Sequence, residues 1–516
     1  MADIREWRNS FVPINRVPLD ILSLISTHLP SQKGRFRVTF VCRHWRRTFL
    51  QQAALWSELN LPKGEVYAKT LLERAKGSPL GVFTRHGDPV SVIKLLTPHT
   101  KQIRHLEFLH NHWVDIQRFL ELNPGPFPLL RTLIINAIEG NGPNAMIPPS
   151  SPLFSNAVNL TWFHLHSEVS PFLSHFTFPN LTAFELSTLP VEGFEVSQLL
   201  DFLEASPMLR TVRMRIIADV LLEGVPWDRL VVLPNVEFLY LTVTDGGPGY
   251  RIAAHMACPS VRYTLLLHEM DDSDRIPEEI FPAPVSWDAI VRQYTRSPVE
   301  EVTLKIRSAK DPIIACSLTF RSPDTTAIGL GFKVVASNED GSDTEPDIPY
   351  EDMQVEVFSQ ASRTIQGHPL LANVKRLHIS HWFLCFSPDW TTPIANEVGR
   401  LFKSVGPLEE LTVHRCDLRT YLPSLFDLPR FDDIEQPVIF PKTKELTISH
   451  PLVSPRECAE AIVGLAKSQH ALGVPFERVT VRMKNPQGTM EERLRPWVGE
   501  VHCYDEIFIV EDLGFV

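Results

Sequence analysis

Apolar residues recur in one short pattern through most of the chain after residue 100. An apolar residue is followed by two variable residues, a second apolar residue, one variable residue and a third apolar residue, as in residues 103–108 (IRHLEF) and 130–135 (LRTLII). The last four positions alternate, which is typical of a β-strand with one buried face. Twelve copies, one of them with a polar first residue, begin at Ile103, Leu130, Leu160, Leu181, Leu209, Val236, Val261, Val299, Val374, Leu408, Thr443 and Phe476.

Proline and helical periodicity fill the spaces between these copies. Nine of the twelve copies have a proline one or two positions before their first residue. Proline ends a preceding helix and favours extended backbone before it. Apolar residues at helical spacing predict helices at 196–203, 287–294, 394–402 and 458–466. Most successive copies begin 21 to 38 residues apart, so each interval has room for a strand, a turn and a helix.

This repeat resembles the leucine-rich repeat, in which neighbouring units stack their strands into one sheet. The Asn or Cys that the family places after its apolar positions occurs here only as Asn111 and Cys416. The resemblance therefore implies an α/β fold in the form of an irregular, leucine-rich-repeat-like solenoid. The alternative is a non-repetitive α/β domain whose strands begin alike.

The repeat is interrupted between the copies at Val299 and Val374, and we expect an insertion at about 307–372. Within it, residues 313–320 and 327–335 predict two strands, because apolar and β-branched residues lie on both sides of a turn-forming stretch. Residues 338–352 carry seven acidic side chains, which predicts a solvated acidic loop.

The first sixty residues follow a different pattern. Within residues 14–58, apolar residues recur at helical spacing in three short segments, and Pro30 separates the first two. Three short helices make only a marginal core, so we expect a partner or the rest of the chain to complete it. This stretch holds seven basic and two acidic residues, although the whole chain has a net charge of −11.

Three motifs in this stretch resemble the F-box family. Residues 17–25 (VPLDILSLI) match its Leu-Pro-x-acidic-apolar opening, residues 40–46 (FVCRHWR) its apolar-Val-Cys-basic-x-Trp-basic motif, and Leu55-Trp56 its closing Leu-Trp. Val17 replaces the usual leucine, and Lys33-Gly34 replace a common acidic-Leu pair. An unrelated helical bundle with a buried tryptophan is the alternative. The resemblance implies a small helical F-box that docks on a Skp-type adaptor through Pro18, Ile21, Leu22, Ile25, Val41, Cys42 and Trp45.

Composition and charge exclude several classes of protein. Hydrophobic residues make up 44% and charged residues 22% of the 516 residues, which is typical of folded domains. The net charge of −11 argues against nucleic acid as a partner, even for the basic segment 33–47. We find no apolar run long enough for a membrane helix and no secretory signal. The seven cysteines form no C-x-x-C pair, so we expect reduced thiols and an intracellular location, cytoplasmic or nuclear.

Candidate catalytic or ligand sites are few. His164 and His166 share one face of a predicted strand, a geometry that zinc can use, and residues 110–112 (HNH) offer a similar pair. No third ligand follows either pair at a usable spacing. Gly329 and Gly331 supply only part of a phosphate-binding loop. We therefore expect a non-catalytic protein without metal or cofactor, and a metal-dependent enzyme is the remote alternative.

The two resemblances together imply a substrate-recognition subunit of a Skp/cullin/F-box-type ubiquitin ligase. Residues 1–13 would form a tail, 14–60 the F-box, 61–99 a linker or capping helical segment, and 100–516 the array. The adaptor would bring a cullin, and the array would bind an unknown target protein. A non-catalytic interaction scaffold without ligase duty is the alternative. Side chains that face away from the core supply the target-binding candidates Arg213, Arg215, Tyr240, His164 and His166.

Overall fold

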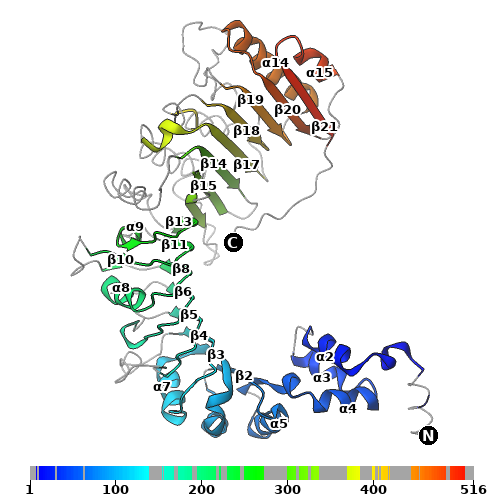
Figure 1. Cartoon of the computed structure of the whole chain (residues 1–516), viewed down its shortest axis with the longest axis vertical. Helices are drawn as coiled ribbons and strands as arrows, with labels where there is room; N and C mark the ends of the chain where they lie inside the picture. Colours follow the sequence, from blue (N-terminus) through cyan, green and yellow to red (C-terminus); the bar gives the residue numbers. More distant parts are fainter. Residues whose placement is uncertain are drawn as a thin grey trace, which may run out of the picture. The chain divides into compact units, whose positions relative to one another are not determined.

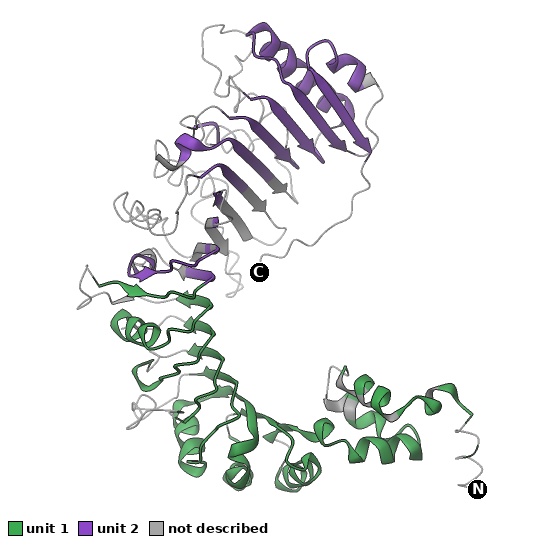
Figure 2. Cartoon of the chain, in the orientation of Figure 1, with its two compact units in different colours: residues 1–236 green, residues 237–516 purple. Residues whose placement is uncertain are grey.

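The chain forms two compact units, residues 1–236 and residues 237–516 (Figure 1, Figure 2). The computed structural model describes residues 7–505 with gaps. The longest gaps are 139–153, 272–298, 336–368, 384–397 and 419–442.

The first unit begins with a group of short helices around a small core. Leu22, Trp45, Phe49 and Trp56 are buried there. The Trp45 and Phe49 rings lie 5.4 Å apart between centroids, and the indole N–H of Trp56 donates to the carbonyl of Phe49 at 3.0 Å. The elements are η1 (Pro13–Arg16), α2 (Leu19–Thr27), α3 (Gln32–Val38), α4 (Arg43–Gln51) and η2 (Ala53–Trp56).

An aromatic cluster joins these helices to α5 (Glu65–Ala75). The Phe36 ring of α3 lies 5.3 Å from Trp56 and 5.9 Å from Tyr67. The Arg74 guanidinium lies 4.7 Å from the centre of the Trp56 ring, a favourable cation–π contact. The closing tryptophan of the helical segment therefore anchors that segment to the first helix that follows it.

Parallel strands form the sheet of the first unit, in the order β1-β2-β3-β4-β5-β6-β8. Figure 1 shows α7 and α8 on the same side of this sheet. The strands are β1 (Glu58–Asn60), β2 (Leu80–Arg85), β3 (Ile103–Asn111), β4 (Thr132–Ala137), β5 (Trp162–Ser167), β6 (Ala183–Thr188) and β8 (Thr211–Ile216). The connecting elements include α6 (Val90–Lys94), η4 (Thr97–Gln102), α7 (Trp113–Leu122), η5 (Leu173–His175), β7 (Phe194–Glu195), α8 (Val196–Glu204), β9 (Val220–Leu221) and β10 (Val231–Val232).

Alternate residues of these strands are buried, as the apolar pattern predicts. Phenylalanine fills much of the space between β5, β6, η5 and α8. Ring centroids in this cluster lie 4.7 Å apart for Phe184 and Phe202 and 5.0 Å apart for Phe163 and Phe176. The predicted helix at 196–203 is confirmed as α8, whose apolar face packs into the same core.

A position near the end of the strands lies buried inside the first unit and is polar on three of them. Asn111 is buried, and its side-chain oxygen accepts a hydrogen bond from the Thr84 hydroxyl at 3.4 Å. Register places Ala137, Ser167 and Thr188 at the same position of the next three strands. Alanine on β4 and buried hydroxyls on β5 and β6 therefore stand in place of the asparagine of a regular repeat.

Asparagine amides instead connect successive copies just before their first apolar residue. Asn159 donates from Nδ2 to the carbonyl of Pro128 at 2.7 Å, Asn180 to that of Val158 at 2.8 Å, and Asn235 to that of Pro207 at 3.0 Å. Each bond spans one repeat. These amides satisfy carbonyls that the strand ladder leaves without a partner.

The strands of the second unit pair side by side in the order β11-β13-β16-β15-β14-β17-β18-β19-β20-β21. Figure 1 shows α14 and α15 together beside β20 and β21. The strands are β11 (Phe238–Thr244), β13 (Tyr263–Asp271), β14 (Glu301–Ser308), β15 (Ile313–Arg321), β16 (Ala327–Val335), β17 (Arg376–Phe383), β18 (Glu410–His414), β19 (Glu445–Ser449), β20 (Arg478–Met483) and β21 (Glu500–Asp505). The other elements are α9 (Gly249–Ala254), β12 (Met256–Ala257), η6 (Pro369–Asn373), α14 (Pro455–Ala471) and α15 (Thr489–Leu494).

The two strands predicted within the insertion at 307–372 are present as β15 and β16, and they pair with strands of the repeat. β15 pairs antiparallel with both β14 and β16, and β16 pairs parallel with β13. The hairpin therefore separates the copies that begin at Val261 and Val299. The acidic stretch 338–352 and the predicted helix at 287–294 lie outside the described residues.

The sequence pattern missed three strands of the main pairings, β1, β2 and β21, and the two-residue strands β7, β9, β10 and β12. β2 lies in the segment 61–99, where we expected helices, and it pairs with β3. Thr84 stands where an apolar residue would complete the pattern. β21 follows the pattern in residues 498–503 (VGEVHC) if cysteine is counted as apolar, and it pairs with β20. The predicted helix at 458–466 is confirmed within α14, which Ser454 caps by accepting a hydrogen bond from the Glu457 N–H.

The amide bridge at Asn180 gives a first prediction. Asn180→Asp keeps the size of the side chain and removes the donor, so the free energy of unfolding should fall by about 1 kcal/mol. Urea unfolding followed by circular dichroism measures the change. Asn180→Ala should cost a similar amount, and an aspartate variant as stable as the wild type would show that the bridge contributes nothing.

Candidate interaction surfaces

The helical segment exposes large apolar side chains. The exposed fractions are 44% for Ile21, 55% for Leu24, 72% for Phe40 and 58% for Val41. Isolated exposed apolar residues are common, but several within one short segment indicate a surface that a partner covers. We call Ile21, Leu24, Phe40 and Val41 the apolar docking face.

The residues matched to the F-box motifs divide into two groups. Pro18, Ile21 and Val41 are exposed, and Ile25 and Cys42 are partly exposed. Leu22 and Trp45 are buried in the interior of the helical segment. Leu24 and Phe40 are exposed as well. They are not among the adaptor-binding residues predicted from the sequence, although each directly neighbours one of them.

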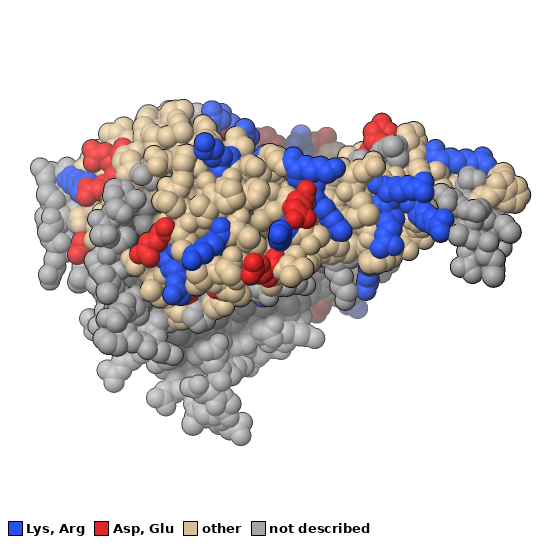
Figure 3. Space-filling model, turned by 90° about the horizontal axis from the view of Figure 1, so that it is seen from below, with Lys and Arg blue, Asp and Glu red and all other residues tan. Residues whose placement is uncertain are grey.

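The N-terminal turn is tied to the junction of α3 and α4. The Cys42 thiol lies 3.8 Å from the side-chain oxygen of Asn15, a weak hydrogen bond between η1 and that junction. Arginine lies over an exposed ring at two places, with Arg46 5.7 Å from Phe40 and Arg16 5.9 Å from the ring of Phe11. Figure 3 shows Lys and Arg side chains gathered over this end of the unit. Exposed arginines here are Arg16, Arg37, Arg43, Arg46 and Arg47.

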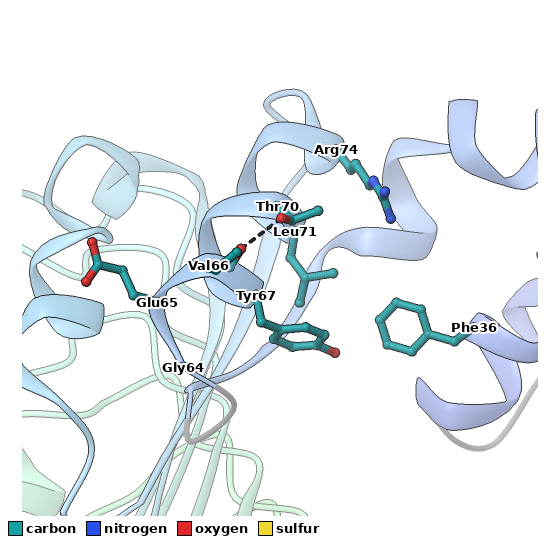
Figure 4. Close-up of a pocket in the computed structure, with 8 residues that line it drawn as sticks. All are labelled: Phe36, Gly64, Glu65, Val66, Tyr67, Thr70, Leu71 and Arg74. Carbon is teal, nitrogen blue, oxygen red and sulfur yellow. Dashed lines mark hydrogen bonds between the residues drawn. The ribbon is translucent and has the colours of Figure 1, made fainter.

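A pocket of about 500 Å³ lies at the joint between α3 and the start of α5 (Figure 4). Phe36, Tyr67, Leu71 and Arg74 form much of its wall. Burial raises the pKa of the Tyr67 phenol, and its hydroxyl has no hydrogen-bond partner among the described residues. The pocket therefore lies at the aromatic cluster that joins the helical segment to α5.

The open face of the first unit consists of the strand residues that point away from the core. His164 and His166 of β5 are half-exposed there, and Arg213 and Arg215 of β8 are exposed. Register aligns His164 with Glu185 and Glu185 with Arg213. Four of the predicted target-binding candidates therefore share one face. Two lie on β5 and two on β8, and β6 lies between these strands. Tyr240, the fifth, is half-buried on β11 of the second unit.

The structure does not assemble a metal or phosphate site from the sequence candidates. Within the described part of the chain, no group of three or more His, Cys, Asp or Glu residues could hold a metal ion. Gly329 and Gly331 lie inside β16, paired with Leu265 and Leu267 of β13, rather than in a loop. Among the residues that the structure describes, no helix has the length and apolar character needed to cross a membrane.

The open face of the second unit carries three rows of aligned side chains across β17–β21. The row at the amino ends is a ladder of ion pairs, in which Arg478 lies 3.2 Å from Glu445 and 2.9 Å from Glu500. The middle row aligns the hydroxyls of three threonines between two histidines. Its members are His378, Thr412, Thr447, Thr480 and His502.

The third row lies at the carboxyl ends of the strands, and we call it the carboxyl-end row. It consists of Ser380, His414, Ser449, Arg482 and Tyr504, in register. Arg415 and His450 directly follow β18 and β19 and extend it. None of the residues of the extended row is among the target-binding candidates predicted from the sequence. Arg415 and His450 lie beyond the strand pattern, and Tyr504 lies on β21, which the pattern missed.

His414 has a perturbed titration. Its ring lies 5.5 Å from that of His450. Burial lowers the pKa of His414 to about 4, and the nearby His450 and Arg415 contribute in the same direction. The His414 imidazole is therefore neutral at neutral pH.

Comparison with known proteins does not assign a family. No protein-family model matches the chain, and no curated protein matches its sequence. Among solved structures, the crystal structure of Listeria monocytogenes InlP aligns with a TM-score of 0.21 and 10% identity, over 50% of this chain and 87% of that chain. A similarity at this TM-score carries no argument, so the parallel α/β repeat fold rests on the strand pairings of the chain itself.

The lowered pKa of His414 predicts a dependence of stability on pH. An unfolded histidine titrates near pH 6.5, so between pH 6.5 and about 4 the unfolded chain binds more protons at this residue than the folded chain. The stability that neutral His414 contributes is present above pH 6.5 and is lost as the pH falls toward 4. His414→Gln should therefore lose less stability than the wild type over this window, as measured by urea midpoints. Parallel curves for the two proteins would contradict the assignment.

Proposed function

We propose that this protein is a non-catalytic substrate receptor of a Skp/cullin/F-box-type ubiquitin ligase. The helical segment would bind the adaptor, and the open faces of the two sheets would bind the target protein. The observation that carries the proposal is the apolar docking face, which exposes Ile21 and Val41 at positions that the F-box motifs assign to the adaptor. The same motifs also assign Leu22 and Trp45 to the adaptor, and both are buried in the helical segment.

The energetics favour a partner that covers the docking face. Burying an exposed Leu, Ile, Val or Phe side chain contributes about 1.5–3 kcal/mol, so the four residues of the face could supply roughly 6–12 kcal/mol before the cost of association. That cost is about 4–15 kcal/mol. The face therefore needs a rim of polar contacts as well, and the exposed arginines around it suit an acidic rim on the adaptor.

A receptor of this kind needs binding surfaces rather than reactive groups. Its task is to hold a target near an enzyme supplied by other subunits, so positioning is its contribution to the reaction. In the first unit, the candidates for target contact are His164, His166, Arg213 and Arg215, which share one open face. In the second unit, Tyr240 and the three rows of the sheet offer further contacts.

The adaptor interface can be tested with acidic substitutions on the docking face. Phe40→Glu with Val41→Glu should weaken capture of a purified Skp-type adaptor by thirtyfold or more, because losing an anchor residue commonly costs about 2 kcal/mol. Both side chains are exposed, so the helices should remain folded. Titration calorimetry measures the affinity, and circular dichroism checks the fold.

Val114→Glu is the matched control, since Val114 is 54% exposed on α7, outside the helical segment. It should leave adaptor binding unchanged. Undiminished capture by the double variant would remove the basis for the F-box assignment. Affinity capture from cells then separates the two functions: adaptor together with cullin supports a ligase receptor, and adaptor without cullin supports an interaction scaffold.

A further inference from the structure

Four neighbouring strands of the second unit end side by side and present basic, aromatic and hydroxyl side chains there. His414 ends β18, Arg482 lies on β20 and Tyr504 on β21, all on the open face. Arg482 and Tyr504 are exposed, and the Arg482 guanidinium lies 5.6 Å from the centre of the Tyr504 ring. The carboxyl-end row is thus accessible and partly preorganised.

The turns after β18 and β19 add two more basic side chains to this row. Arg415 has φ 55° and His450 has φ 48°, a left-handed conformation that such residues rarely adopt. Each uses it to direct its N–H to the neighbouring strand: Arg415 donates to the carbonyl of Ser449 at 2.9 Å, and His450 to that of Arg482 at 2.7 Å. The backbone therefore fixes both residues at the strand ends, next to His414.

The charge of the sheet changes sign along its open face. In the amino-end row, the guanidinium of Arg478 is shared between Glu445 and Glu500. The carboxyl-end row and its extension contain two arginines and two histidines, and Asp505 adds one carboxylate at the end of β21. The His414 ring lies 5.5 Å from that of His450, so basic side chains of neighbouring strands meet at this edge.

We propose that the carboxyl-end row binds a short, extended segment rich in Asp and Glu on the target protein. Guanidinium groups hold carboxylates in a bidentate geometry. From β18 to β21 the row spans three strand spacings, roughly 14 Å, which is the length of about four residues of extended chain. The threonine hydroxyls of the middle row lie alongside and can hydrogen-bond the backbone of such a segment. That the segment belongs to a ligase target rests on the proposed function.

A long polyanion fits the same surface poorly. Glu410, Glu445 and Glu500 form part of the amino-end row, four residues along each strand from the carboxyl-end row, and would repel nucleic acid lying across the sheet. A single phosphate could contact only part of the row, because Arg415 and Arg482 lie on different strands or the turns that follow them. A peptide with carboxylates at intervals matches the spacing better.

The test measures direct binding to the full chain without adaptor. The probe is a fluorescein-labelled octapeptide with Glu at alternate positions, followed by fluorescence anisotropy, and the matched probes carry Gln or phosphoserine at those positions. The Glu peptide should bind at least about tenfold more tightly than the Gln peptide. Arg482→Gln should weaken the Glu peptide by about tenfold.

Arg478→Gln is the control, because it removes the same charge from the same strand and face but in the amino-end row, outside the proposed site. It should change the affinity by less than about twofold. Arg415→Asn gives an independent variant, since asparagine tolerates the left-handed conformation, and it should also weaken binding. Equal affinity of the Glu peptide for wild type, Arg482→Gln and Arg415→Asn would overturn the proposal.

The remaining outcomes are equally decisive. Binding of the phosphoserine peptide without the Glu peptide would assign the row to a phosphorylated partner, against the proposal. Competition by a duplex oligonucleotide at equal charge would indicate a general polyanion surface and also overturn it. Adaptor capture by Arg482→Gln should match the wild type. If the wild-type chain binds the Glu peptide but no adaptor, the proposed ligase function is rejected and the peptide site is retained.

Discussion

The hydrogen-bonded ladder between neighbouring strands is the constraint on which the rest of this protein depends. A single copy of the repeat buries two or three apolar residues, too few to fold alone, and it becomes stable only against its neighbours. The second residue of one copy donates its N–H to the carbonyl of the equivalent residue before it, as Thr182 does to Thr161 at 2.9 Å and Lys444 to Glu409 at 2.9 Å. This bond sets the register of every strand, and the register decides which side chains share a row on the open face.

The two units satisfy the start of each strand with different side-chain chemistry. The first unit uses asparagine amides, such as Asn159 to the carbonyl of Pro128. The second uses ion pairs at the second residue of the copies, such as Lys375 with Glu300 at 3.1 Å and Lys444 with Glu477 at 3.1 Å. Exposed ion pairs contribute about 0–1 kcal/mol each, so the backbone ladder and the apolar core carry most of the stability. The side chains chiefly select the register, which allows the repeat length to vary.

The helical segment is the opposite case, because it has few residues with which to enclose a core. Leu22, Trp45, Phe49 and Trp56 fill its interior, and surface-to-volume scaling leaves other apolar residues outside. Trp56 also contributes to the aromatic cluster with α5. The same limit that makes this segment marginal alone gives it an apolar surface for a partner, so its stability and its proposed function have one physical origin.

The sequence alone determined the repeated strands, because burial on one face of a strand imposes an alternation that is readable without a structure. All twelve copies form strands, and the open-face positions of His164, His166, Arg213 and Arg215 followed from the same alternation. The sequence also indicated the hairpin of β15 and β16 but not its place between β13 and β14, since strand order depends on pairings between distant residues. The left-handed backbone conformation of Arg415 and His450 could not be predicted from the sequence either. Those residues have no local preference for that conformation, and only the neighbouring strand, by accepting their N–H bonds, holds them in it.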